Sequence, residues 1–257
     1  MSTGRFVDDL GVPVALPESV RRVVSLVPSL TEAIAVTRPG LLVAATEWCT
    51  HPPGLTVERV RGTKNPNVRR IAELAPDLVV CNQEENRRLD VERLRDAGIP
   101  VWVTRIRTLD EAFDSMARLF AVALDGTVPD WLSRAREVWS APAPSPIAAV
   151  IPVWRDPWMV VGRDTFTADI ARRLGLRLVH AEGGDRYPTV PESELTRGVE
   201  LAVLPDEPYV FTETDGPEAF PGIAVALVSG RDLTWYGPSL VEARARLTAQ
   251  LAGVRDS

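Results

Sequence analysis

The amino-acid sequence predicts an α/β protein made of two halves that a helix joins. Short runs of β-branched residues alternate with stretches of helical spacing, and the connections between them are short. A proline-rich segment at 141–146 interrupts this alternation, which starts again after it. Strands that alternate with helices indicate an α/β architecture in each half.

In the first half, the run at 23–27 predicts a strand that Pro28 ends, and Ser29 or Thr31 is the expected cap of the helix that follows. Further strands are expected at 41–45, 78–81 and 99–103, and helices at 68–74, 90–96 and 108–124. The resulting order begins as βαβαβ.

A second helix at 129–140 and the proline-rich segment after it give the clearest boundary in the chain. The sequence therefore predicts an N-terminal α/β lobe at 1–126, a bridging helix with its connector at 127–146, and a C-terminal α/β lobe at 147–257. In the last of these, strands are expected at 147–153, 159–161, 178–180, 200–204 and 223–228, and helices at 165–174 and 238–251.

The composition is that of an ordinary globular protein. Of 257 residues, 45% are hydrophobic and 25% are charged, which excludes a disordered or collagen-like chain. The net charge of -6 argues against nucleic acid or an anionic membrane surface as a partner. No apolar run approaches the roughly 20 residues that cross a bilayer, so the protein is not expected to be membrane-spanning.

The commonest nucleotide-binding and hydrolase signatures, GxGxxG, GxxxxGK[ST], GxSxG and HExxH, do not occur in the sequence. Ligands of open α/β sheets gather at the carboxyl ends of strands, so the clusters directly after predicted strands are the candidate site. These clusters lie at 47–51, 82–86, 154–158 and 205–209. Tryptophans in predicted loops suggest a flat or ring-bearing ligand that is held by stacking.

The residue types in these clusters leave several readings open. Cys49 and His51, with Glu47 nearby, can bind zinc, copper or iron if further ligands converge on them, so direct metal binding stays undecided. The turn at 62–67 offers backbone N–H groups and Lys64 to an anionic or amide-bearing ligand, or it simply leads into a helix. The clusters could also be ordinary turns, with the tryptophans covering the edges of a core.

Five motifs follow one another in the first half: RVVSLVPSLTE at 22–32, CTHPP at 49–53, GTKNPN at 62–67, IAELAPDLV at 71–79 and AGIPV at 97–101. With them the chain resembles the class III substrate-binding proteins, which bind vitamin B12 and iron siderophores for ABC importers. The resemblance covers residues 20–240. It implies two Rossmann-like lobes, a bridging backbone helix at 129–140, a ligand cleft between the lobes and little hinge motion.

The sequence thus predicts a non-catalytic binding protein that holds a corrinoid, such as cobalamin, or a related metal chelate in this cleft. No catalytic residue is expected. The expected ligand contacts are Trp48, His51, Lys64, Asn65, Glu85, Trp154, Arg155, Trp158, Tyr209, Trp235 and Tyr236. Of the tryptophans, Trp48, Trp154 and Trp235 are expected to face one pocket.

Two other classes of function stay open. A cytoplasmic relative could use the cleft for metal-dependent or other catalysis, with acid, base or ligand roles for Cys49, His51, Glu84 or Glu207. A protein that docks on another protein would instead expose a large apolar patch outside the cleft.

The beginning of the sequence shows no secretory signal or lipoprotein cysteine. We therefore expect a cytoplasmic protein, or a periplasmic protein or lipoprotein only if the sequence has been trimmed, and an ABC permease is a doubtful partner. Cys49 and Cys81 are expected to be reduced thiols.

Overall fold

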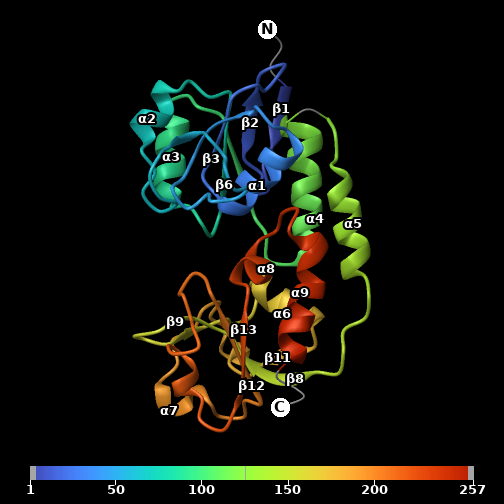
Figure 1. Cartoon of the computed structure of the whole chain (residues 1–257). Coiled ribbons are helices and arrows are strands. Elements are labelled where there is room, and N and C mark those ends of the chain that lie inside the picture. The colour runs from blue at the N-terminus through green and yellow to red at the C-terminus, as the bar shows by residue number, and fades with distance from the viewer. Residues whose placement is uncertain (1–3, 125, 254–257) are drawn as a thin grey trace. The chain divides into compact units, whose positions relative to one another are not determined.

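The computed structural model describes residues 4–124 and 126–253, which form two compact units (Figure 1). Unit 1 comprises Met1–Ile106, Asp110–Ser133 and Tyr236–Pro238. Unit 2 comprises Arg107–Leu109, Arg134–Trp235 and Ser239–Ser257. The division at 126 and 147 that the sequence suggests stays a prediction.

Unit 1 is built on a five-stranded parallel sheet in the order β5-β4-β3-β6-β7. Its strands are β3 (Val23–Ser25), β4 (Leu42–Ala45), β5 (Glu58–Arg59), β6 (Leu78–Asn82) and β7 (Val101–Thr104). A separate antiparallel pair consists of β1 (Gly4–Val7) and β2 (Pro13–Leu16). The helices are α1 (Pro28–Thr37), α2 (Val68–Glu73), α3 (Arg88–Asp96), α4 (Leu109–Arg118) with a π-helical continuation at Leu119–Leu124, and α5 (Asp130–Trp139), which ends in unit 2.

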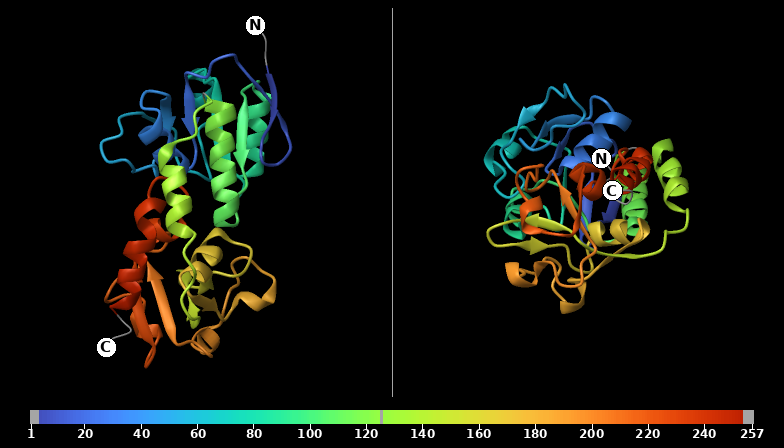
Figure 2. Two further views of the ribbon diagram at one scale, coloured as in Figure 1. Left: turned by 90° about the vertical axis from the view of Figure 1, so that its right-hand side faces the viewer. Right: turned by 60° about the horizontal axis from the view of Figure 1, so that its bottom comes forward.

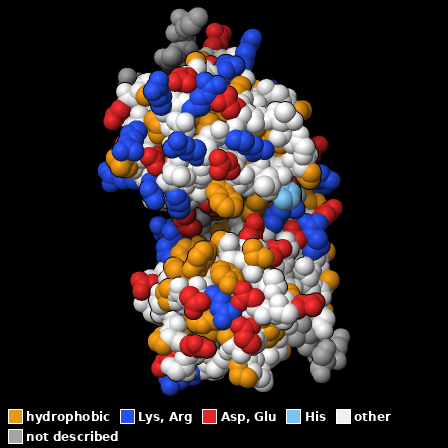
Figure 3. Space-filling view, turned by 60° about the vertical axis from the view of Figure 1, so that its left-hand side comes forward, with side chains coloured by type: hydrophobic (Ala, Val, Ile, Leu, Met, Phe, Trp, Pro, Cys, Tyr) orange, Lys and Arg blue, Asp and Glu red, His pale blue; other side chains and the backbone are white. Residues whose placement is uncertain are grey.

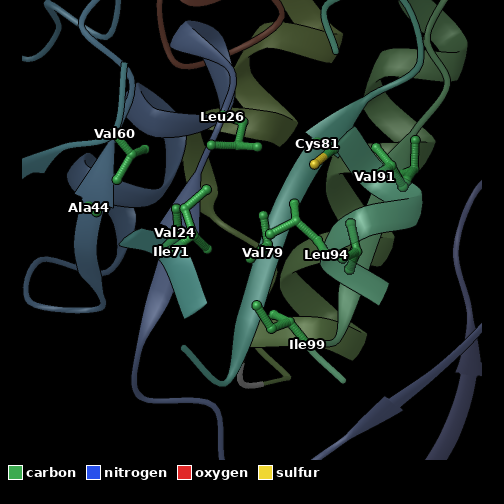
Figure 4. Packing of buried hydrophobic residues seen from close by; sticks show 12 residues of the cluster. Val24, Leu26, Ala44, Val60, Ile71, Val79, Cys81, Val91, Leu94 and Ile99 are labelled. Atoms are coloured by element: carbon green, nitrogen blue, oxygen red, sulfur yellow. The ribbon is translucent and has the colours of Figure 1, made fainter. Parts of the chain in front are cut away.

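The core of unit 1 lies between the sheet and the helices α2 and α3 (Figure 4). Val24, Val79 and Cys81 point from the strands toward Ile71 of α2 and Leu94 of α3, and all five are fully buried. Every residue of β6 is buried, because a central parallel strand is covered on both faces. This explains why β6 is a continuous apolar run rather than an alternating one.

Unit 2 contains a four-stranded parallel sheet in the order β11-β8-β12-β13. Its strands are β8 (Ile147–Val150), β11 (Leu176–Leu178), β12 (Leu201–Pro205) and β13 (Ala224–Val228), and β9 (Pro152–Trp154) pairs antiparallel with β10 (Met159–Val160). Helix α6 (Phe166–Arg173) packs against β11, and α9 (Leu240–Ala252) packs against β13 (Figure 2). The remaining helices are α7 (Glu192–Leu195) and α8 (Gly230–Thr234), with 3-10 turns at Ala181–Gly183 and Pro217–Ala219.

The predicted α/β class is confirmed, and the structure corrects some element bounds. Helix α1 has Val27 as its N-cap and Pro28 in its first turn, so neither Ser29 nor Thr31 caps it. The Thr31 hydroxyl instead donates a hydrogen bond to the Val27 carbonyl at 2.9 Å. The strand expected at 147–153 is divided into β8 and β9, since Pro152 has no N–H to donate to a continuous ladder.

Other differences are small. The helix expected at 108–124 changes to π-helical geometry after α4, and the strand expected at 178–180 lies two residues earlier as β11. None of the helices in the described part of the chain combines the length and apolar character that a membrane-spanning helix requires.

Candidate functional site

In unit 1, the candidate residues follow parallel strands at their carboxyl ends, where side chains from neighbouring strands gather. In unit 2, Tyr209 follows the parallel strand β12, whereas Trp154, Arg155 and Trp158 lie in the antiparallel β9–β10 hairpin that comes after β8. We call the residues at this edge of the first sheet the unit 1 surface: Trp48, His51, Lys64, Asn65 and Glu85. We call those at the corresponding edge of the second sheet the unit 2 surface: Trp154, Arg155, Trp158 and Tyr209.

Trp48 is the most exposed aromatic residue of the unit 1 surface, with 68% of its area accessible. It follows β4 and lies beside Gly62 and Asn65 in the turn after β5. A Cβ atom at Gly62 would lie 2.6 Å from Asn65 Oδ1 and 3.2 Å from Trp48 Nε1. Gly62 therefore allows the indole and the amide to meet over the turn, where both can contact a ligand.

Lys64 is the only lysine among the 257 residues. Its ammonium group donates a hydrogen bond to the Glu84 carbonyl oxygen, which joins the turn after β5 to the turn after β6. Burial raises the pKa of the half-buried Glu85 carboxyl, while the positive charge of Lys64 opposes this shift. Lys64 thus brings an exposed positive charge to the unit 1 surface.

Asn86 holds the loops of the unit 1 surface together. Its Oδ1 accepts a hydrogen bond from the Asn82 N–H at 2.9 Å, and its Nδ2 donates to the carbonyls of Leu26 at 3.2 Å and Thr63 at 3.0 Å. These bonds connect the ends of β3 and β6 with the turn after β5. Asn86 belongs to the candidate cluster at 82–86, but nothing in the sequence indicates this positioning role.

Cys49 and His51 occupy different environments. The Cys49 thiol is buried, with Thr31 Oγ1 at 3.0 Å and Thr46 Oγ1 at 3.1 Å, and burial raises its pKa. The half-buried His51 has its Nδ1 3.1 Å from Thr50 Oγ1. Among residues 4–124 and 126–253, no group of three or more His, Cys, Asp or Glu side chains is placed to hold a metal ion.

The aromatic residues of the unit 2 surface pack on one another and on Phe211. Trp154, at the end of β9, is 47% exposed and meets the half-buried Tyr209 edge-on, with ring centroids 5.6 Å apart. Tyr209 in turn lies 4.7 Å from Phe211, and Phe211 stacks on Trp158 at 6.0 Å. Trp158 is only 5% exposed and belongs to the core of unit 2, so Trp154 and Tyr209 offer the accessible ring surface.

Figure 3 brings forward the side of the molecule on which β9 projects in Figure 1, and hydrophobic side chains gather there beside basic and acidic ones. Arg155 Nη1 forms ion pairs with Asp215 and, at 2.6 Å, with Glu218. Its guanidinium also lies 5.1 Å from the ring centroid of Trp158. A ligand contact by Arg155 stays a prediction.

The last two candidates are buried. Trp235, directly after α8, is 8% exposed and belongs to unit 2, with the Arg231 guanidinium 5.5 Å from its ring. Tyr236 is 5% exposed and belongs to unit 1. Since Trp48 belongs to unit 1 and Trp154 to unit 2, the single pocket expected for the three tryptophans stays a prediction.

A cavity of about 470 Å³ lies elsewhere in unit 1. Phe6, Leu16, Val20, Arg38 and Leu124 are among its lining residues. Leu16 and Val20 precede β3, and Arg38 lies between α1 and β4, which places this part of the lining at the amino edge of the sheet rather than at the unit 1 surface.

Comparison with known proteins found no matching protein-family model. The chain is 25% identical over 259 residues to a vitamin B12-binding protein of Pectobacterium atrosepticum, covering 94% of this chain and 91% of that protein. The solved structure of the periplasmic vitamin B12 binding protein BtuF of Vibrio cholerae matches with a TM-score of 0.76 and 19% identity, over 94% of this chain and 100% of that one. The resemblance to class III substrate-binding proteins is confirmed.

The proteins similar to this chain are described with two kinds of ligand, haem and vitamin B12. The periplasmic haem-binding protein RhuT of Roseiflexus matches with a TM-score of 0.75 and 18% identity, over 92% of this chain and 99% of that one. A vitamin B12-binding protein of Vibrio cholerae is 34% identical over 107 residues, which is 41% of this chain and 39% of that protein. The fold alone therefore does not choose between a corrinoid and a haem.

Proposed function

We propose that this protein is a non-catalytic binding protein for a corrinoid or a related metal chelate. The observation that carries the proposal is the accessible pair of Trp154 and Tyr209 at the carboxyl edge of the unit 2 sheet. Similarity to a vitamin B12-binding protein over 94% of the chain supports a large ring as the ligand.

The two surfaces offer complementary chemistry to such a ligand. Trp48 and Trp154 provide flat apolar faces, and the burial of these faces under a ring stabilises the complex. Lys64 and Asn65 provide N–H donors for the amide and phosphate groups at the edge of a corrinoid, or for the carboxylates of a haem. That one ligand molecule contacts both surfaces stays a prediction.

Binding is tested with cyanocobalamin and with haemin, each titrated into the purified protein by calorimetry. Removal of an exposed tryptophan from a stacked contact should cost about 1–2 kcal/mol, so Trp48→Ala and Trp154→Ala should each weaken binding about 5- to 30-fold. The matched control is Leu89→Ala on α3, since Leu89 is 55% exposed and lies outside both surfaces.

The double variant of Trp48 and Trp154 shows whether the two surfaces bind the same molecule. If they do, its affinity should fall by about the product of the two single effects, with the stoichiometry still at one. A folded protein that binds neither ligand at millimolar concentration would refute the proposed function.

The comparisons give no support to the enzyme alternative, because the similar proteins are described as binding proteins. They also give no support to the expected cytoplasmic location, because BtuF and RhuT are described as periplasmic. The location of this chain and an ABC permease partner stay predictions, and fractionation of the native cells measures the first of them.

A further inference from the structure

Tyr209 lies at the unit 2 surface with its ring accessible and its hydroxyl group engaged. We propose that Tyr209 contacts the ligand only through its ring and gives no oxygen ligand to a bound metal. The unit 2 surface would then favour chelates whose metal ion is already fully coordinated. This inference rests on the proposed function.

The hydroxyl group of Tyr209 has a fixed partner. It donates a hydrogen bond to Asp215 Oδ2 at 2.7 Å, and Asp215 Oδ1 pairs with Arg155. Arg155 also pairs with Glu218, whose carboxylate accepts the Gly216 N–H at 2.6 Å. The acceptor is therefore held in place by an ion-pair network rather than by one flexible side chain.

The ring of Tyr209 is held independently of its hydroxyl. Trp154 meets it edge-on at 5.6 Å, and Phe211 lies 4.7 Å away at an interplanar angle of 46°. Phe211 itself is buried and stacked on Trp158. An aromatic ring at position 209 would keep these contacts without any hydroxyl group.

Coordination of ferric iron by a tyrosine requires the phenolate. Loss of the Tyr209 proton would place a second anionic oxygen beside the Asp215 carboxylate. The hydrogen bond to Asp215, partial burial and the charges of Asp215 and Asp156 raise the pKa of Tyr209, and only the charge of Arg155 opposes them. The carboxylates of Asp215 and Asp156 thus disfavour the phenolate.

This arrangement predicts a difference between the two ligand types. Cyanocobalamin has both axial positions of its cobalt filled, so it needs only ring and edge contacts from the protein. Haemin has an open axial position on its iron, and it would gain no bond from Tyr209. The unit 2 surface therefore favours cyanocobalamin over haemin because the Tyr209 hydroxyl does not coordinate the metal.

Substitution of Tyr209 separates the ring from the hydroxyl. Tyr209→Phe should bind cyanocobalamin within about twofold of the wild-type affinity, whereas Tyr209→Ala should bind it at least tenfold more weakly. With haemin, the wild-type protein and Tyr209→Phe should give the same visible spectrum, without a phenolate-to-iron charge-transfer band. A charge-transfer band that is present in the wild type and lost in Tyr209→Phe would overturn the inference.

A second measurement needs no ligand. The chain has three tyrosines, so the ultraviolet absorbance of phenolate during alkaline titration can be assigned by comparison with Tyr209→Phe. Tyr209 should titrate above the usual tyrosine value of about 10, and Asp215→Asn should lower its pKa. Titration of Tyr209 at or below 10 would overturn the inference even if neither ligand binds, whereas failure of both ligands to bind would by itself refute the proposed function.

Discussion

Replacement of Asn86 by alanine should destabilise unit 1 because Asn86 connects three of its loops. The side chain is buried and forms one hydrogen bond through Oδ1 and two through Nδ2. Alanine leaves the Asn82 N–H and the carbonyls of Leu26 and Thr63 without this partner. The loops that carry Lys64 and Glu84 would then lose their common support.

The magnitude follows from the three hydrogen bonds. Each bond of this kind contributes about 0.5–1.5 kcal/mol net of its exchange with water, so their loss should reduce the free energy of unfolding by about 3 kcal/mol. Water that reaches the edge of the sheet would recover part of this cost. We expect a loss of about 2–4 kcal/mol.

The assay is urea-induced unfolding followed by far-ultraviolet circular dichroism. The control is Asn65→Ala, since Asn65 is an exposed asparagine of the same surface, and it should change stability by no more than about 0.5 kcal/mol. Asn86→Asp keeps the acceptor but loses both donors, so it should be at least as unstable as Asn86→Ala. A loss below about 1 kcal/mol in Asn86→Ala would refute the positioning role.

Three further predictions concern Asp169 and Gly216 of unit 2 and Cys81 of unit 1. Burial alone would raise the pKa of Asp169, but hydrogen bonds from the Leu109 N–H and two arginines hold this pKa below its usual range. The resulting stabilisation is present above about pH 4 and is lost as the pH falls through the lowered pKa of the folded state. Asp169→Asn should therefore make the free energy of unfolding, measured with urea, fall less steeply as the pH is lowered. Gly216→Ala should cost more than about 2 kcal/mol in thermal unfolding, since φ is +121° and the new Cβ would lie 2.6 Å from Phe211 Cδ1. Burial raises the pKa of Cys81 to about 12. A disulfide reagent at pH 8 should therefore modify the Cys81 thiol only after the protein unfolds. Rapid reaction of this thiol in the folded protein would contradict its buried position.

The sequence was sufficient for elements with strong local signals. Strand β6 was expected at 78–81 and extends over Leu78–Asn82, because its apolar residues fill a sheet that is covered on both faces. The short helix α8 was not expected, although Ser229 and Asp232 have capping-box spacing and the Ser229 hydroxyl accepts the Asp232 N–H at 3.2 Å. Strand β5 could not be recognised, since two residues carry no periodicity.

The sequence predicts which loops carry the candidate residues, but it does not predict which of these residues are buried, because burial depends on tertiary packing. Trp154 and Trp158 belong to one predicted loop, yet only the first is exposed. Trp158 is buried by Phe211 and Phe220, which lie more than fifty residues later in the chain. The role of Asp215 likewise depends on its approach to Tyr209 and Arg155, and no spacing in the sequence indicates it.

The position of Lys64 has a practical consequence for measurement. Apart from an α-amino group, its ammonium is the only primary amine of the chain. Amine-directed dyes, biotin esters and carboxymethyl sensor chips can therefore attach only at Lys64 or at the α-amino group. Attachment at Lys64 would cover the unit 1 surface and could make a competent protein look inactive. Lys64→Arg keeps the positive charge and directs the coupling to the α-amino group, which makes it the better starting protein for immobilised assays.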